Sequence, residues 1–195
     1  KPLTSEQLAA LLPGKHGYIA GLDCIDHTAL ESADQLKVIS RYGVGIDCVD
    51  LTAAKEKGIV VTNTPGANSV SVAELALALM LSLARQIPDS VAAVHQGKWP
   101  RPSGVTLENK TIGILGLGAV GKKLARRLSG FDCVLLAYDP YADKAFAAAN
   151  GIQLLGMEDV ISRSDFLSLH LPLLPETRGL VNADFLAKMK AGSFL

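Results

Sequence analysis

The sequence predicts an α/β fold with parallel sheets, divided between two domains. Three observations predict it. Short apolar runs alternate with helix-like stretches, a turn-rich segment interrupts this alternation at residues 63–68, and a strand, a glycine-rich turn and a helix follow one another at residues 112–128. Alternating strand and helix signals are typical of βαβ units, whose strands run parallel. With 195 residues, 49% of them apolar, the chain can bury one good core or two small ones.

Before the turn-rich segment, apolar runs at residues 18–20, 38–40 and 59–62 predict three short strands. Helix-like stretches are expected at residues 5–12, 27–32 and 50–57. Asp50 can cap the last of these helices with its carboxylate, and Gly58 can end it. Residues 1–68 are therefore the first predicted domain, and residues 69–195 are the second.

The second domain begins with a long alanine- and leucine-rich helix at residues 69–85. Pro88 is expected to interrupt it, and a second helical stretch reaches about Gln96. The proline- and glycine-containing segment 97–104 predicts a loop that leads into the next strand.

A glycine motif then follows the apolar strand at residues 112–115. Gly116 permits a tight turn, Gly118 lets the backbone approach a pyrophosphate, and Gly121 lets the next helix pack against the strand. The free amides and the dipole at that helix N-terminus attract phosphates. The basic residues of this helix are expected on its solvent side: Lys122, Lys123, Arg126 and Arg127.

A second apolar strand, at residues 133–138, ends in Asp139, which lies 18 residues after Gly121 and is followed by Pro140. An acid at about this offset binds the ribose hydroxyls of a dinucleotide. A carboxylate there would repel a 2′-phosphate, so the sequence predicts NAD rather than NADP as the cofactor, although an arginine elsewhere could alter that preference. A purely structural glycine turn is the alternative.

Further along, helices are expected at residues 144–150 and 157–162, a strand at residues 165–170, and a loop at residues 171–177. Asn182 can cap a last helix that runs to about Lys190. His170 lies at the carboxyl end of its strand, where open α/β sheets bind ligands. A histidine that bonds its own loop is the alternative explanation.

Composition excludes several classes of partner. Nineteen basic and nineteen acidic residues balance, so no nucleic acid or anionic membrane partner is expected. The longest apolar stretch, residues 75–84, is too short to cross a bilayer. The cysteines and histidines have no metal-binding spacing, and three scattered cysteines predict reduced thiols in a cytoplasmic protein. Both ends of the chain look truncated.

Four segments resemble the D-isomer-specific 2-hydroxyacid dehydrogenases in order: residues 41–50, residues 61–65 with 71–74, the glycine motif with Asp139, and residues 170–177. The resemblance implies an incomplete Rossmann-type doubly wound sheet at 69–195 and a smaller, N-terminally truncated, flavodoxin-like α/β substrate domain at 1–68. NAD would lie in the cleft between them.

By this resemblance, Arg41 and the backbone amides of Val44 and Gly45 bind the substrate's carboxylate or another substrate anion. A simple strand-to-helix turn is the alternative for that loop. The expected cofactor-binding residues are Thr64, Val72, Gly116, Gly118, Ala119, Val120, Gly121, Asp139, Pro140, His170, Leu171, Pro172 and Thr177.

The implied activity is NAD-dependent interconversion of a D-2-hydroxy acid and a 2-oxo acid, in a homodimer formed through the helices after Ser69. The family's catalytic arginine, glutamate and histidine would lie beyond Leu195, so no catalytic residue is assigned within the chain, which is expected to be inactive alone. Two alternatives stay open: an NAD-binding corepressor on the same scaffold, and a formate or phosphite dehydrogenase.

Overall fold

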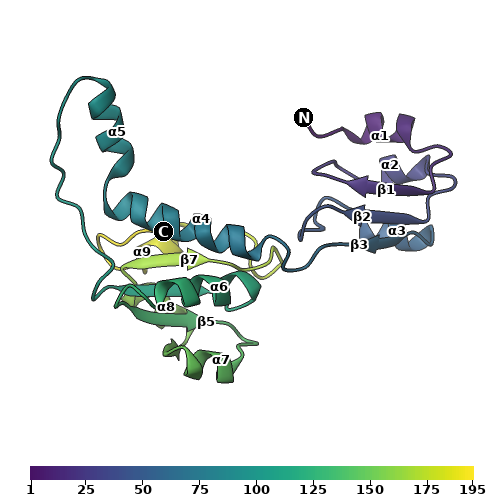
Figure 1. The fold of residues 1–195 in the computed structure, drawn as a ribbon. Coiled ribbons are helices and arrows are strands. Elements are labelled where there is room, and N and C mark those ends of the chain that lie inside the picture. Colours follow the sequence, from purple (N-terminus) through teal and green to yellow (C-terminus); the bar gives the residue numbers. More distant parts are fainter. The chain divides into compact units, whose positions relative to one another are not determined.

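The computed structural model describes all 195 residues, and they form two compact units, Lys1–Asn68 and Ser69–Leu195 (Figure 1). The division falls where the turn-rich segment of the sequence predicts a domain boundary. No single helix is long and apolar enough to span a membrane; two consecutive helices, Ser69–Ala84 and Ile87–His95, reach that length and apolarity only together, with a bend of 64° between them.

The first unit contains a three-stranded parallel sheet in the order β1-β2-β3. Its elements are α1 (Ser5–Leu11), β1 (Gly17–Ala20), α2 (His27–Glu31), β2 (Val38–Arg41), α3 (Leu51–Glu56) and β3 (Val60–Thr62). Leu8, Leu30 and Ala54, one from each helix, share a core with Ile39 of β2. The three helices therefore cover one face of the sheet, whereas Ile19 on β1 is 78% exposed.

The second unit contains a four-stranded parallel sheet in the order β6-β5-β4-β7. Its strands are β4 (Thr111–Leu115), β5 (Val134–Tyr138), β6 (Ile152–Leu154) and β7 (Phe166–Leu169). Its helices are α4 (Ser69–Ala84), α5 (Ile87–His95), α6 (Ala119–Leu128), α7 (Lys144–Ala149), α8 (Met157–Arg163) and α9 (Ala183–Ala187).

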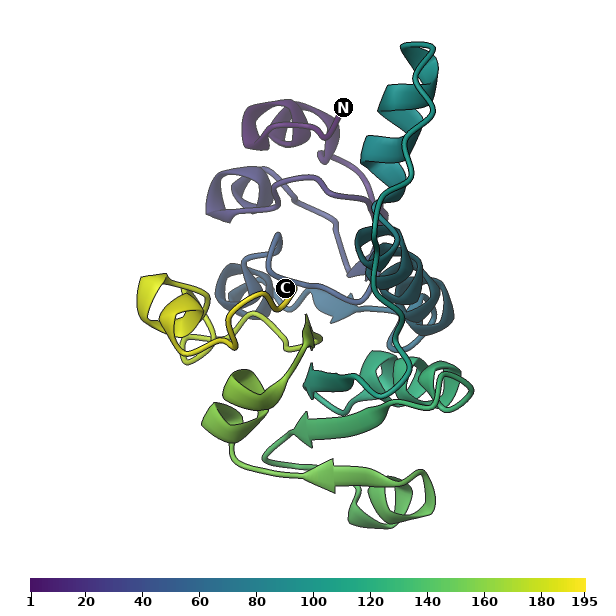
Figure 2. The same ribbon diagram turned by 90° about the vertical axis from the view of Figure 1, so that its left-hand side faces the viewer.

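Both faces of this second sheet are covered, as Figure 2 shows. Residues of α4, α6 and α7, such as Ala73, Leu124 and Ala147, share one core with the sheet. Val160 of α8 and Phe185 of α9 belong to a second core on the opposite face. The arrangement is a doubly wound parallel sheet, which confirms the predicted Rossmann-type α/β class.

The strand order places the candidate site. β5 and β6 lie on one side of β4, and β7 lies on the other, so the chain reverses direction across the sheet between β4 and β7. In open parallel sheets, ligands bind outside the carboxyl ends of the strands at such a reversal. The loops that follow Leu115 of β4 and Leu169 of β7 meet at this point.

The structure differs from the sequence-based expectations in three places. β6 was not expected, α6 begins at Ala119, inside the glycine motif rather than after it, and α9 ends at Ala187 rather than near Lys190. The predicted interruption of the long helix before Pro88 is confirmed: α4 ends at Ala84, Gln86 has a left-handed φ of 51°, and the proline lies in the first turn of α5. That turn accepts a proline, since its N–H groups have no intrahelical partner.

Candidate functional site

The three glycines after β4 differ in what they make possible. Gly116 has φ +95°, and a Cβ there would lie 2.5 Å from the carbonyl oxygen of His170. A Cβ on Gly121 would collide with the carbonyl oxygen of Gly116, which is why only glycine lets α6 start so close to the loop. A Cβ on Gly118 would meet no atom within 4 Å, so the space above this residue is open. Gly116 and Gly121 build the turn, and Gly118 leaves room for a ligand.

The N-terminus of α6 keeps its hydrogen-bonding capacity. Its N-cap is Gly118, which offers no side chain, and no side-chain cap bonds the first turn. By contrast, α7 and α9 are capped by Asp143 and Asn182. Uncapped amides and the positive end of a ten-residue helix therefore face the space above Gly118, where they suit an anion.

Asp139 follows β5 directly and is fixed by the backbone. Its Oδ2 accepts a hydrogen bond of 2.8 Å from the Leu117 N–H, inside the glycine loop, and its Oδ1 accepts one of 2.8 Å from the Tyr141 N–H. A carboxylate has about four lone-pair sites, so each oxygen can accept a further bond from a hydroxyl group. The acid is thus held against the loop and can still bind a vicinal diol.

These groups line a cavity of about 780 Å³, a size typical of sites for large organic ligands. Its lining residues are Gly116, Leu117, Gly118, Ala119, Lys122, Tyr138, Asp139, Pro140, Tyr141, Asp143, Met157, His170, Leu171, Pro172, Leu174, Glu176, Thr177 and Leu180. The cavity combines apolar walls, uncapped amides and a carboxylate, and this combination fits a dinucleotide.

The loop after β7 forms one wall of this cavity. Thr177 Oγ1 donates to the carbonyl oxygen of Pro172 at 2.6 Å and accepts from the Leu174 N–H at 2.8 Å. These bonds close residues 172–177 into a compact turn. Leu171, Pro172 and Thr177, three of the predicted cofactor-binding residues, line this cavity, and their contact with a cofactor stays a prediction.

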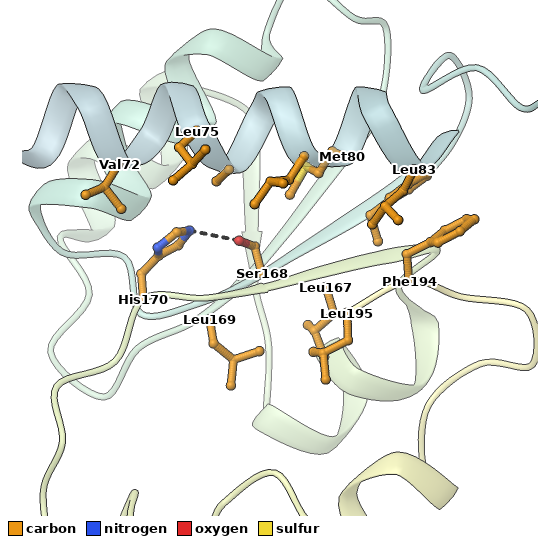
Figure 3. Close-up of a pocket in the computed structure, with 13 residues that line it drawn as sticks. Val72, Leu75, Met80, Leu83, Leu167, Ser168, Leu169, His170, Phe194 and Leu195 are labelled. Carbon is orange, nitrogen blue, oxygen red and sulfur yellow. Dashed lines mark hydrogen bonds between the residues drawn. The ribbon is translucent and has the colours of Figure 1, made fainter. Parts of the chain in front are cut away.

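His170 lies where the cavity meets an apolar groove under α4. In Figure 3 its ring lies below Val72 and Leu75, and its Nε2 is 2.9 Å from Ser168 Oγ. Burial lowers the pKa of His170 below its ordinary 6.5. A neutral imidazole therefore lines both hollows at neutral pH, and its ring bonds a strand residue rather than its own loop.

Several predicted cofactor residues lie elsewhere. Val120 packs against the core, and Gly121 is buried; neither lines the cavity. Val72 lines the apolar groove with His170. Thr64 belongs to the first unit, where its N–H bonds the carbonyl oxygen of Gly43 at 3.0 Å. Their roles toward a cofactor stay predictions.

The predicted substrate loop after β2 contains a buried arginine. Arg41 is only 6% exposed, and its Nη1 donates to the carbonyl oxygens of Ala20 (3.3 Å) and Tyr42 (2.8 Å). Its Nε is buried without a partner. Arg41 thus supports the loop from below, while Val44 and Gly45 are exposed. Binding of a substrate anion by these three residues stays a prediction.

Five polar or charged residues of the cavity were not predicted from sequence: Lys122, Tyr138, Tyr141, Asp143 and Glu176. For Lys122 a signal existed, because it directly follows the last motif glycine and so lies on the first turn of α6. No group of three or more His, Cys, Asp or Glu side chains could hold a metal ion.

Comparison with known proteins agrees with this geometry. Residues 77–195 match the family described as D-isomer specific 2-hydroxyacid dehydrogenase, NAD binding domain. The D-3-phosphoglycerate dehydrogenase of Mycobacterium bovis is 42% identical over 193 residues, which are 98% of this chain and 37% of that protein.

Two solved structures are similar in fold. D-lactate dehydrogenase from Aquifex aeolicus, complexed with NAD and lactic acid, has a TM-score of 0.88 at 27% identity, with 95% of this chain and 56% of that one covered. A formate dehydrogenase from Granulicella has a TM-score of 0.88 at 30% identity, with 94% and 51% covered. The chain thus spans less than two thirds of each of these proteins, and it belongs to the D-isomer-specific 2-hydroxyacid dehydrogenase family, whose NAD-binding domain its residues 77–195 match.

Proposed function

We propose that this chain binds NAD in the cavity beside the glycine loop. The observation that carries the proposal is the conjunction of an uncapped helix N-terminus at Gly118 with the fixed carboxylate of Asp139 on one cavity. The amides of α6 would hold the pyrophosphate, and Asp139 would bind the adenosine ribose. Leu171 and Pro172, which line the cavity, would supply an apolar wall for the adenosine.

The whole protein, we propose further, interconverts a D-2-hydroxy acid and a 2-oxo acid. The proteins that this chain resembles support this proposal, because they include a D-3-phosphoglycerate dehydrogenase and a D-lactate dehydrogenase complexed with NAD and lactic acid. NAD supplies the hydride acceptor in such a reaction. No residue of these 195 is assigned as the proton-transferring group, and we expect the chain alone to be inactive.

The first experiment measures equilibrium binding of NADH and NADPH to the 195-residue chain. Binding is detected by fluorescence energy transfer from the protein to the nicotinamide, or by calorimetry. Saturable binding of one NADH per chain, tighter than that of NADPH, is expected. Absence of NADH binding by a folded chain would contradict the proposal.

A second experiment separates the possible activities of the whole protein. D-lactate, D-glycerate, D-3-phosphoglycerate, formate and phosphite should be assayed side by side with NAD. Turnover of a 2-hydroxy acid is expected. Turnover of formate or phosphite alone would favour the alternative that the Granulicella structure represents. NAD binding with no turnover of any of them would favour a corepressor.

A homodimer is proposed from the shape of the second unit. α5 projects away from the sheet, and none of its residues is buried (Figure 1). Ile87, Val91 and Val94 recur on one side of it at helical spacing, each about half exposed. An apolar helix face without cover in its own chain suits a second copy. Ultracentrifugation should show a dimer, and replacing Val91 by Asp should give monomers.

For location, we propose the cytoplasm. Cys24, Cys48 and Cys133 are all free thiols, a state that reducing compartments maintain.

A further inference from the structure

The charges around the cavity are unequal. Its lining contains three acidic side chains, Asp139, Asp143 and Glu176, but only one lysine or arginine, Lys122. A cofactor with a 2′-phosphate brings about two additional negative charges at neutral pH. To accept it, the cavity would need a cation that is free to turn toward the phosphate.

The one cation is already engaged. Lys122 Nζ lies 2.8 Å from Asp143 Oδ2, and the two side chains are 33% and 47% exposed. The same ammonium lies 5.1 Å from the centre of the Phe146 ring. An ion pair and a cation–π contact thus hold Lys122 against the start of α7.

Asp143 is in turn fixed by the backbone. Its Oδ1 accepts the Phe146 N–H at 3.0 Å and so caps α7, while its Oδ2 binds Lys122. The hydrogen bond from Lys122 lowers the pKa of the Asp143 carboxyl, which keeps it ionised at neutral pH. The carboxylate that holds Lys122 therefore cannot follow the lysine if a ligand attracts it.

We propose that Asp143 is a second determinant of cofactor choice, because it retains the only cation of the cavity in an ion pair and so withholds it from a 2′-phosphate. Asp139 then acts by repulsion and Asp143 acts by removing the compensating charge. This inference rests on the proposed binding of NAD in the cavity.

The decisive variant is Asp143→Asn. Asparagine caps helices about as well as aspartate, so α7 keeps its cap while the ion pair is lost. The measurement is the ratio of the NADPH and NADH dissociation constants. Because a part-exposed ion pair contributes little, the ratio should fall by about fourfold in the otherwise unsubstituted protein.

In an Asp139→Ala background the repulsion is gone, and Lys122 can form a charge-assisted bond to the phosphate. There Asp143→Asn should lower the ratio by about tenfold. Adding Lys122→Gln should reverse both decreases in the ratio of the NADPH and NADH dissociation constants. Both decreases should be smaller at high salt, because the contact between Lys122 and the 2′-phosphate is ionic and part-exposed.

The matched control is Glu74→Gln. Glu74 forms an ion pair of 2.7 Å with Arg127 on the same helix α6, and it does not line the cavity. Its substitution changes the net charge equally and should leave the ratio unchanged. An equal effect of both variants would contradict the inference, as would a decrease that survives Lys122→Gln. If the unsubstituted chain binds no NADH, the proposed function itself is refuted. If it binds NADH but Asp143→Asn leaves the ratio of the NADPH and NADH dissociation constants unchanged, only the role of Asp143 is refuted.

Discussion

The loops after β2 and β4 each contain spaced glycines, and each is predicted to bind an anion, yet the structure equips them differently. After β4 the chain enters α6 within four residues, and the helix N-terminus has no side-chain cap. After β2 the next helix, α3, starts only at Leu51, and Asp50 caps it by accepting the Ala53 N–H at 2.9 Å.

The side chains beneath the two loops differ as well. Arg41 is buried under the loop after β2 and donates to backbone carbonyl oxygens there. Asp139 lies beside the loop after β4, accepts from its backbone and still faces a cavity. Glycine spacing alone therefore does not indicate an anion site. What distinguishes the second loop is that its helix amides remain available.

The largest effect is expected at Gly121, where an added methyl group would collide with the carbonyl oxygen of Gly116. Gly121→Ala should lower the free energy of unfolding by about 3 kcal/mol and abolish NADH binding. Gly45→Ala is the counterpart in the first loop, since its Cβ would meet only the side-chain oxygen of Asp47 at 2.8 Å. Chemical denaturation should show a change below about 1 kcal/mol there. Equal losses would remove the distinction between the loops.

Gly118→Val tests the open space rather than the fold. No atom lies within 4 Å of the Cβ position, so the protein should remain folded. The valine would fill the approach to the helix amides, and NADH affinity should fall by about a hundredfold. Gly130, which is equally open but outside the cavity, provides the control: Gly130→Val should bind NADH normally. Intact affinity in Gly118→Val would place the pyrophosphate elsewhere.

Asp139→Ala should weaken NADH binding and lower the preference over NADPH by about tenfold, because a ribose acceptor and a repelling charge are lost together. Competition between the two cofactors gives the preference directly. The folded state should survive, although the amides of Leu117 and Tyr141 lose their acceptor. A preference equal to that of the unsubstituted protein would refute the assignment of Asp139 to the ribose.

Asp50→Ala removes the cap of α3 and should cost about 1 kcal/mol of stability. Asp50→Asn keeps the cap and should cost much less. Neither change should alter NADH affinity, because the N-terminus of α3 is capped by Asp50 of the same unit and is not proposed to bind the cofactor. Weakened NADH binding by a fully folded Asp50 variant would show that the two loops are not separate in function.

The smallest effect concerns pH. Since burial lowers the folded-state pKa of His170 below 6.5, the unfolded chain takes up this proton first as pH falls. Above about pH 6.5 His170 therefore does not affect the free energy of unfolding. Below that pH it lowers the free energy of unfolding progressively, until the pH reaches the folded-state pKa of His170. As the pH falls from 7.5 to 5.5, its contribution should therefore lower the Tm. His170→Gln should lessen that drop, and His95→Gln, on exposed α5, should not.

Sequence patterns predicted the elements that have local causes. Apolar runs located β1 to β5 and β7, and the carboxylate of Asp50 and the amide of Asn182 were recognised as caps. β6 was missed because its three residues, Ile-Gln-Leu, contain no apolar run, whereas β3, of equal length, begins with two adjacent valines. Its pairing with β5 is a tertiary effect that no local pattern carries.

The candidate site was predictable in part for the same reason. The roles of Gly116, Gly118 and Asp139 depend on backbone geometry that their spacing encodes. The position of Lys122 depends on α7, because an acid 21 residues away, Asp143, holds its ammonium at the cavity. The place of Lys122 at the start of α6 follows from its spacing after the last motif glycine, but its ion pair with Asp143 depends on how the start of α7 packs beside α6.

The most direct test is an amide-resolved NMR titration of this 20.5 kDa chain with NAD. Large shifts are expected for the N–H groups of Leu117, Gly118 and Ala119, together with a shift for that of Tyr141, because Asp139 would bind the ribose. Unmoved signals in the glycine loop, with shifts confined to other parts of the second unit, would contradict this expectation.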